Sequence, residues 1–184
     1  MSGKMKLSRR GMMAGGLFGA LAVPSVAGLA SWQWKTGGKS LLLHDDSLNA
    51  GKRFADAGRA AGATTRAIHG DPVRFGREVL AQKPALIAGV SRYSEALLLG
   101  EVALEEGYVL ATELRGCGDR CEGFTVSPGW NALNRMAADA GGNWVEMLAA
   151  WAANPQASTL PEVRRFAAAA DRGTVLGWVL VPRG

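Results

Sequence analysis

The chain has 184 residues and a net charge of +5, and residues 1–30 supply four basic side chains and no acidic one. The rest, about 150 residues, is long enough for one domain with a substantial core. That part holds 17 basic and 16 acidic side chains. This near-neutral balance excludes the basic surface that nucleic-acid binding requires, so we expect no nucleic-acid partner.

The first thirty residues have the features of an export signal. Basic side chains precede an uncharged run over residues 11–30, and Pro24 is followed by small residues of the kind found at cleavage sites. The sequence Ser8-Arg9-Arg10-Gly11-Met12-Met13 resembles the motif of twin-arginine (Tat) signals, with methionines where that motif prefers Phe and Leu. The resemblance, carried by Arg9 and Arg10, implies recognition by the Tat translocase, folding before export and a periplasmic location.

A membrane anchor is the alternative interpretation of the same run, because twenty uncharged residues can span a bilayer. Several glycines and Pro24 dilute its hydrophobicity, which favours a cleaved signal. We therefore expect a signal peptide over residues 1–30, a linker over 31–39 and a single domain over 40–184. If the signal is retained, it is the only membrane contact we expect, and it tethers the domain on the periplasmic side.

Apolar runs alternate with helical patterns from residue 40 to residue 112. The runs predict strands at 40–44, 64–68, 84–90 and 108–112, and the patterns between them predict helices over 47–61, from Pro72 onward, and up to Gly107. The expected N-caps are Ser47, Asp71, and either Ser91 or Ser94. Helical connections of this length predict parallel pairing, hence a single α/β domain with an open, doubly wound, mostly parallel sheet of strand order 2-1-3-4.

The pattern after residue 112 is less regular. It predicts a short strand at 124–126, a helical region over 130–153 with a break at Gly141-Gly142, and a helix over 161–170. A closing strand at 174–181 follows, and its direction and partner are left open. The fold class is thus α/β with a helical C-terminal part.

The two cysteines, Cys117 and Cys121, lie in one glycine-containing loop. In an oxidising compartment they can close that loop as a disulfide. A redox-active pair is the alternative, although the spacing is not Cys-x-x-Cys. We expect the structural disulfide.

Polar residues follow each of the first four predicted strands, at the edge where open α/β sheets bind ligands. The candidate ligand-binding residues of this edge are His44, Asp45, Asp46, His69, Asp71, Ser91, Arg92 and Glu113. Two histidines with carboxylates can hold a divalent metal, and such a metal can activate water for hydrolysis. Helix N-termini after Ser47 and Ser91 can instead bind a small anion. The same residue types are also ordinary helix caps that need no ligand.

One stretch resembles part of a known family. Asp71-Pro72, the strand Pro84-Ala85-Leu86-Ile87-Ala88-Gly89 with Ser91, and the Ala/Leu-rich helix up to Gly107 resemble one lobe of type I periplasmic binding proteins. The resemblance implies an α/β lobe whose residues after that strand help to hold a small ligand. Those receptors close two lobes around the ligand, and this chain has the length for one.

The chain has six tryptophans, and two of them mark a candidate interface. Trp144 and Trp151 are seven residues apart and share a helix face with Met147. Such a face packs in a core or, if exposed, docks a partner protein.

The leading hypothesis is a non-catalytic accessory or assembly subunit of a periplasmic protein complex, with a redox complex as one candidate. The alternatives are a small-molecule or metal-binding protein that uses the edge residues, and a metal-dependent hydrolase. The sequence contains no nucleophile elbow, phosphate-binding loop or dinucleotide motif, so neither an enzyme nor a particular cofactor is predicted.

Overall fold

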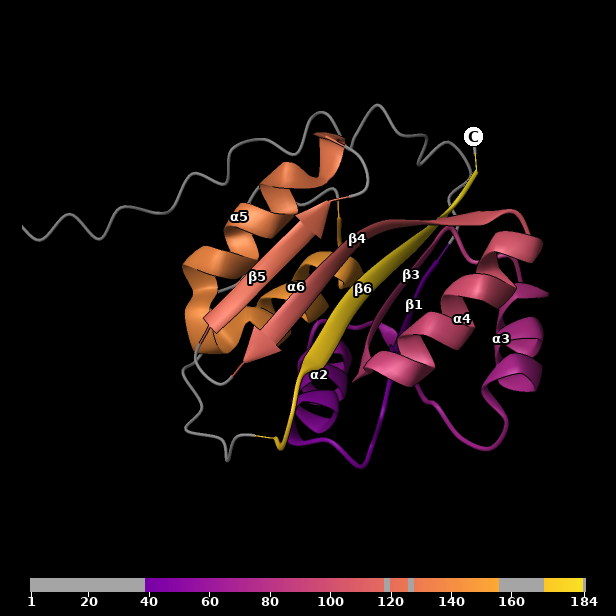
Figure 1. Cartoon of the computed structure of the whole chain (residues 1–184), viewed down its shortest axis with the longest axis horizontal. Helices are drawn as coiled ribbons and strands as arrows, with labels where there is room; N and C mark the ends of the chain where they lie inside the picture. The colour runs from indigo at the N-terminus through magenta and orange to yellow at the C-terminus, as the bar shows by residue number, and fades with distance from the viewer. Residues whose placement is uncertain (1–38, 118–119, 126–127, 156–170, 184) are drawn as a thin grey trace, which may run out of the picture.

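The computed structural model describes residues 39–117, 120–125, 128–155 and 171–183 (Figure 1). The predicted signal peptide, the linker up to residue 38 and the helix predicted over 161–170 lie outside these ranges. None of the helices within them is long and apolar enough to cross a membrane.

The described strands form one mixed sheet with the order β2-β1-β3-β6-β4-β5. The strands are β1 (Ser40–His44), β2 (Thr64–Ala67), β3 (Leu86–Arg92), β4 (Tyr108–Cys117), β5 (Arg120–Thr125) and β6 (Val175–Pro182). β2, β1 and β3 are parallel, whereas β6 pairs antiparallel with both β3 and β4. The α/β class is confirmed. The predicted order 2-1-3-4 is wrong in one respect, because the closing strand is inserted between β3 and β4.

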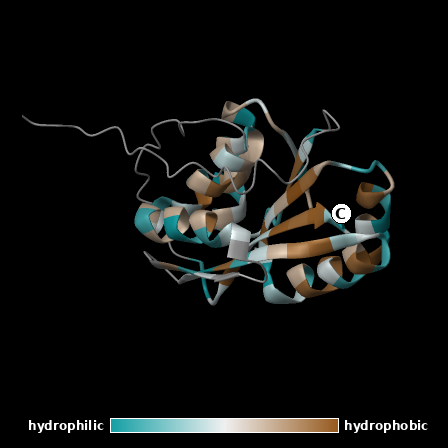
Figure 2. Ribbon diagram, turned by 90° about the horizontal axis from the view of Figure 1, so that it is seen from above, coloured by the Kyte–Doolittle hydropathy of each residue, from teal (hydrophilic) through white to brown (hydrophobic). Residues whose placement is uncertain are grey.

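Helices cover both faces of the sheet, as a doubly wound fold requires (Figure 1). One face carries α2 (Asn49–Ala60), α5 (Asn131–Ala140) and α6 (Trp144–Ala153), and the other carries α3 (Pro72–Leu80) and α4 (Tyr93–Glu105). The short 3₁₀ helices η2 (Pro128–Trp130) and η3 (Gly141–Asn143) flank α5. The predicted break of the 130–153 helix is confirmed, since Gly141 has φ of 54°. In Figure 2 the strands are mostly hydrophobic, as expected for a sheet buried between two helical layers.

Of the three N-cap residues predicted from the sequence, the structure confirms one. Asp71 accepts a hydrogen bond of 2.8 Å from the Arg74 N–H, and Pro72 occupies the first turn of α3 as predicted. The prediction of Ser47 for α2 is wrong. The N–H groups of Asn49 and Ala50 instead donate to the carboxylate of Asp171, at 2.7 and 2.8 Å.

The third cap also differs from the prediction, because α4 begins after Arg92 rather than after a serine. The backbone N–H of Arg92 donates to the carboxylate of Glu95 at 3.4 Å. Neither Ser91 nor Ser94 is the N-cap residue of α4.

Two buried tryptophans depend on glycines in the sheet. A Cβ atom on Gly89 would lie 2.1 Å from Cζ2 of Trp178, and one on Gly116 would lie 2.4 Å from Cζ2 of Trp144. The indole rings therefore lie directly on the backbone of the strands, which is possible only where there is no side chain. Trp178 packs in the core under α3 and α4, and Trp144 in the core under α2, α5 and α6.

Candidate functional site

The edge predicted from the sequence is formed by the carboxyl ends of β1 and β3, where two of its residues meet. Asp45 is buried, and its carboxylate accepts a hydrogen bond of 2.8 Å from the Ser47 N–H. Its other oxygen lies 3.5 Å from Nε of Arg92. The pair ties the end of β1 to the start of α4, which is a structural role.

The two histidines do not form a metal site. His44 is buried, its Nδ1 has no hydrogen-bond partner within the described chain, and burial lowers its pKa. His69 is exposed, and its ring lies edge-on against Phe75 with the centroids 5.4 Å apart. No group of three or more His, Cys, Asp or Glu residues in the described ranges could hold a metal ion. The metal-binding and hydrolase alternatives therefore lack a ligand set there.

Glu95 is half-buried and Ser91 is fully buried at this edge. Burial raises the pKa of Glu95, and the charges of Asp45 and Asp46 add to this effect whereas Arg92 opposes it. The Oγ of Ser91 accepts a hydrogen bond of 3.0 Å from Nε1 of Trp178. Its hydroxyl is thus occupied in the core and does not face a ligand.

The tryptophan face predicted as an interface lies in the core. Trp144, Met147 and Trp151 are 3%, 4% and 2% exposed. Trp151 makes an edge-to-face contact with Trp130, with the ring centroids 5.8 Å apart. The core interpretation of this face therefore holds, and the docking interpretation is wrong for these side chains.

The cysteine pair is described only in part. The register places Cys121 opposite Gly116, and Cys117 opposite Arg120. Cys121 is buried, whereas the side chain of Cys117 is not among those described. The disulfide stays a prediction.

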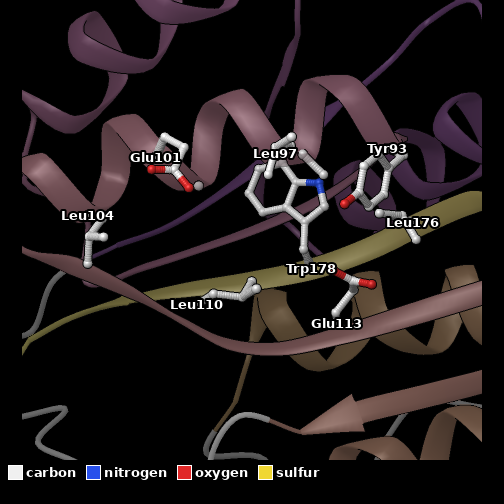
Figure 3. Close-up of a pocket in the computed structure, with 10 residues that line it drawn as sticks. Tyr93, Leu97, Glu101, Leu104, Leu110, Glu113, Leu176 and Trp178 are labelled. Atoms are coloured by element: carbon white, nitrogen blue, oxygen red, sulfur yellow. The ribbon is translucent and has the colours of Figure 1, made fainter.

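The most distinctive surface of the described chain is a groove between α4 and strands β4 and β6, which we call the α4 groove (Figure 3). It has a volume of about 210 Å³. Six residues of α4 line one side, and four residues of the two strands form the floor and the other side. They are Tyr93, Ala96, Leu97, Gly100, Glu101 and Leu104 of α4, Leu110 and Glu113 of β4, and Leu176 and Trp178 of β6.

One of the predicted ligand-binding residues, Glu113, lines the α4 groove. This residue was expected after the fourth strand, but β4 continues to Cys117, so Glu113 lies inside the strand. Its carboxylate accepts a hydrogen bond of 2.8 Å from Nε of Arg115 and lies in the lining of the groove. The other predicted ligand-binding residues are not part of this lining.

Helix α4 is apolar on two sides, and only one of them is buried. Leu99, Val102 and Ala103 face the core. The exposed large hydrophobic residues of the described chain all belong to this same helix: Tyr93 (55%), Leu97 (49%), Leu98 (41%) and Leu104 (49%). A helix that is apolar around most of its circumference is normally enclosed by other elements. The apolar residues on both sides of this helix could therefore have been recognised from the sequence of residues 93–104.

The charge of α4 is uniformly negative. Glu95, Glu101, Glu105 and Glu106 lie on or directly after the helix, and no Lys or Arg occurs among residues 93–106. Glu105 forms an ion pair with Arg77 of α3 at 3.2 Å. Glu101 is exposed, lines the groove and has no ion-pair partner in the described ranges. The groove is thus apolar with an acidic margin.

In comparisons with known proteins, no family model, curated protein or solved structure matches the chain. The geometry of the described residues is therefore the basis for assigning a function.

Proposed function

We propose that this protein is a non-catalytic, exported accessory subunit that binds another polypeptide in the α4 groove. The observation that carries the proposal is that, within the described ranges, the exposed large hydrophobic side chains are confined to α4, three of them in the lining of one groove. Contiguous apolar surface of this kind marks interaction sites on soluble domains. The proposal retains the function predicted from the sequence and moves the docking element from α6 to α4.

The size and lining of the groove favour a polypeptide over a small molecule. Pockets for small molecules typically have volumes of about 300–1,000 Å³ and several converging polar groups. The α4 groove, at about 210 Å³, is smaller and open, and its charged lining residues are Glu101 and Glu113. A space of this size fits one or two apolar side chains that project from a larger partner.

The exposed side chains can supply much of the binding free energy. Complete burial of a leucine contributes about 1.5–3 kcal/mol, so each half-exposed leucine of α4 adds roughly 1 kcal/mol when a partner covers it. Leu97 and Leu104 both line the groove and are both 49% exposed. They are the expected energetic centre of the interface.

The same proposal includes export through the Tat translocase, a periplasmic location, and a disulfide between Cys117 and Cys121. The Ser-Arg-Arg sequence at residues 8–10 supports the first two, and the cysteine spacing supports the third. The intact mass of the protein isolated from the periplasm, measured with and without thiol alkylation, tests all three. A full-length cytoplasmic protein that takes up two alkyl groups would contradict them.

The binding function is tested with the full chain expressed in its own host. A photo-crosslinking residue replaces Leu97, and in a second strain it replaces Ala60, which is exposed on α2. We expect a discrete crosslinked product of defined stoichiometry from position 97 and none from position 60.

Two substitutions provide a matched pair for the same experiment. Leu97→Asp places a charge in the groove, whereas Leu98→Asp places the same charge on a neighbouring exposed residue that does not line it. Native mass spectrometry should show that Leu97→Asp dissociates the complex and that Leu98→Asp retains it. Equal retention in both variants, with no specific crosslink at position 97, would refute the proposed function.

A further inference from the structure

We infer that the occupant of the α4 groove is an amphipathic α-helix of a partner protein that carries Lys or Arg beside its apolar face. This inference rests on the proposed function and specifies the partner element. It is drawn from three features of the described residues: the space beside α4, the shape of the helix surface that borders it, and the charge of its margin.

Within the described ranges, α4 has no helix on one of its sides. One face of the sheet has α2, α6 and α5, and α5 lies against β5 at the edge of the sheet. On the opposite face α3 and α4 are the described helices, and none of the described helices lies beside α4 over β5 (Figure 1). Helices pack about 8–10 Å apart, so one helix placed next to α4 completes this layer.

The surface of α4 that borders the groove suits close packing against another helix. Ala96, Gly100 and Leu104 are spaced by four residues and form one ridge along the groove. A Cβ atom on Gly100 would have no atom of the described residues within 4 Å, so none of them requires the glycine. A glycine inside a helix costs about 1 kcal/mol relative to alanine, and here it leaves a notch that admits a partner side chain.

The floor of the groove is apolar. Figure 3 shows Trp178 extending from β6 toward α4, with Leu110 on the same floor. The hydrogen bond from Trp178 to Ser91 fixes the indole in this position. Recognition of an amphipathic helix in a groove uses this combination of a rigid apolar floor and an adjacent helix.

The charge of the margin selects a basic partner and opposes a second copy of this chain. Glu101 has no ion-pair partner in the described ranges, whereas Glu113 already pairs with Arg115. Lysine or arginine beside the apolar face of a partner helix would neutralise Glu101. Two copies of α4 packed against each other would instead bring their unpaired Glu101 carboxylates into one interface, where like charges repel.

The experiment uses two synthetic peptides as probes for the purified full chain. Both have the same leucine and alanine positions at helical spacing, and the flanking positions are all Lys in one peptide and all Glu in the other. Fluorescence anisotropy of labelled peptide gives the affinity, and circular dichroism shows whether the peptide becomes helical on binding. We expect the Lys peptide to bind as a helix at least tenfold more tightly, with the difference shrinking as salt is added.

Variants of the groove test the two parts of the inference separately. Gly100→Leu fills the notch and should weaken the Lys peptide at least tenfold, whereas Gly100→Ala should weaken it only slightly. Glu101→Lys should reduce the preference for the Lys peptide about fivefold. Asp56→Lys makes the same charge change on α2, across the sheet, and should leave the preference unchanged.

Several results would overturn the inference. They are equal binding of the two peptides, binding in an extended conformation, and undiminished binding by Gly100→Leu. A dimer in analytical ultracentrifugation that Leu97→Asp dissociates would assign the groove to a second copy. If both peptides fail while the crosslink at position 97 persists, the helix inference fails and the proposed function stands.

Discussion

Replacement of Gly89 by alanine tests the packing that forms the floor of the groove. The new Cβ atom would lie 2.1, 2.4 and 2.5 Å from three atoms of the Trp178 indole, so the ring must withdraw to reach the ordinary contact distance of 3.4 Å. It cannot do so without weakening its hydrogen bond of 3.0 Å to Ser91. Trp178 is 2% exposed, so water cannot take over as the acceptor.

The expected change in the free energy of unfolding has three contributions, two that destabilise the fold and one that stabilises it. Overpacking a core costs about 1–3 kcal/mol, and a buried donor left without its acceptor costs about 1–3 kcal/mol. Alanine regains about 0.5–1 kcal/mol of backbone entropy relative to glycine. We therefore expect Gly89→Ala to lower the free energy of unfolding by about 2–4 kcal/mol, measured by urea denaturation.

A matched control carries the same chemical change at an open position. Gly100→Ala meets no atom within 4 Å and should raise the free energy of unfolding by about 0.5–1 kcal/mol. Opposite signs for the two substitutions are the expected result. A neutral or stabilising Gly89→Ala would show that the indole does not lie on β3 as described, and the geometry of the groove floor would have to be revised.

Three further predictions concern long-range contacts and pH. Asp171→Ala removes the cap of α2 and should cost about 1–2 kcal/mol in thermal or urea unfolding, whereas Asp46→Ala, at an exposed loop residue, should cost little. Arg53→Ala breaks the bidentate pair with Glu146, which is 3% exposed, and should cost about 3 kcal/mol; a loss below about 1 kcal/mol would contradict this pairing of α2 with α6. Burial lowers the pKa of His44, so the unfolded chain binds more protons in mild acid, and the free energy of unfolding should fall as the pH drops below about 6.5. His44→Phe should flatten that part of the urea-denaturation profile between about pH 7.5 and pH 5.5, and an unchanged slope would assign it to other groups.

The sequence predicted best those elements whose identity depends on local periodicity. The alternation of strands and helices up to residue 112 is confirmed, as is the cap of α3 by Asp71, since both depend on residues a few positions apart. The insertion of β6 between β3 and β4 could not be predicted from the local pattern, because its pairings join residues that are 59 or more positions apart. The cap of α2 by Asp171 was missed for the same reason, and no local sequence signal predicts it.

The candidate site shows a different limit. Whether an apolar side chain is exposed depends on which element covers it, and that information is not local. Trp144 and Leu97 both occur in apolar helical segments, yet the first is 3% exposed and the second 49%. The difference arises because α6 is enclosed by α2 and α5, whereas one side of α4 has no neighbouring helix in the described ranges.

The topology explains why the α4 groove exists. In a uniformly parallel sheet every connection between neighbouring strands crosses over one face, usually as a helix. Here β4 is followed by the antiparallel β5, with Cys117 and Arg120 already paired, so the two strands form a hairpin with no crossover helix. The helix that would have lain beside α4 is therefore absent from this connection, and the apolar side of α4 is left exposed. A polypeptide that binds there would fill the position that the hairpin leaves open. We therefore expect that dissociation of this polypeptide exposes Leu97 and Leu104 and does not disturb the core beneath them.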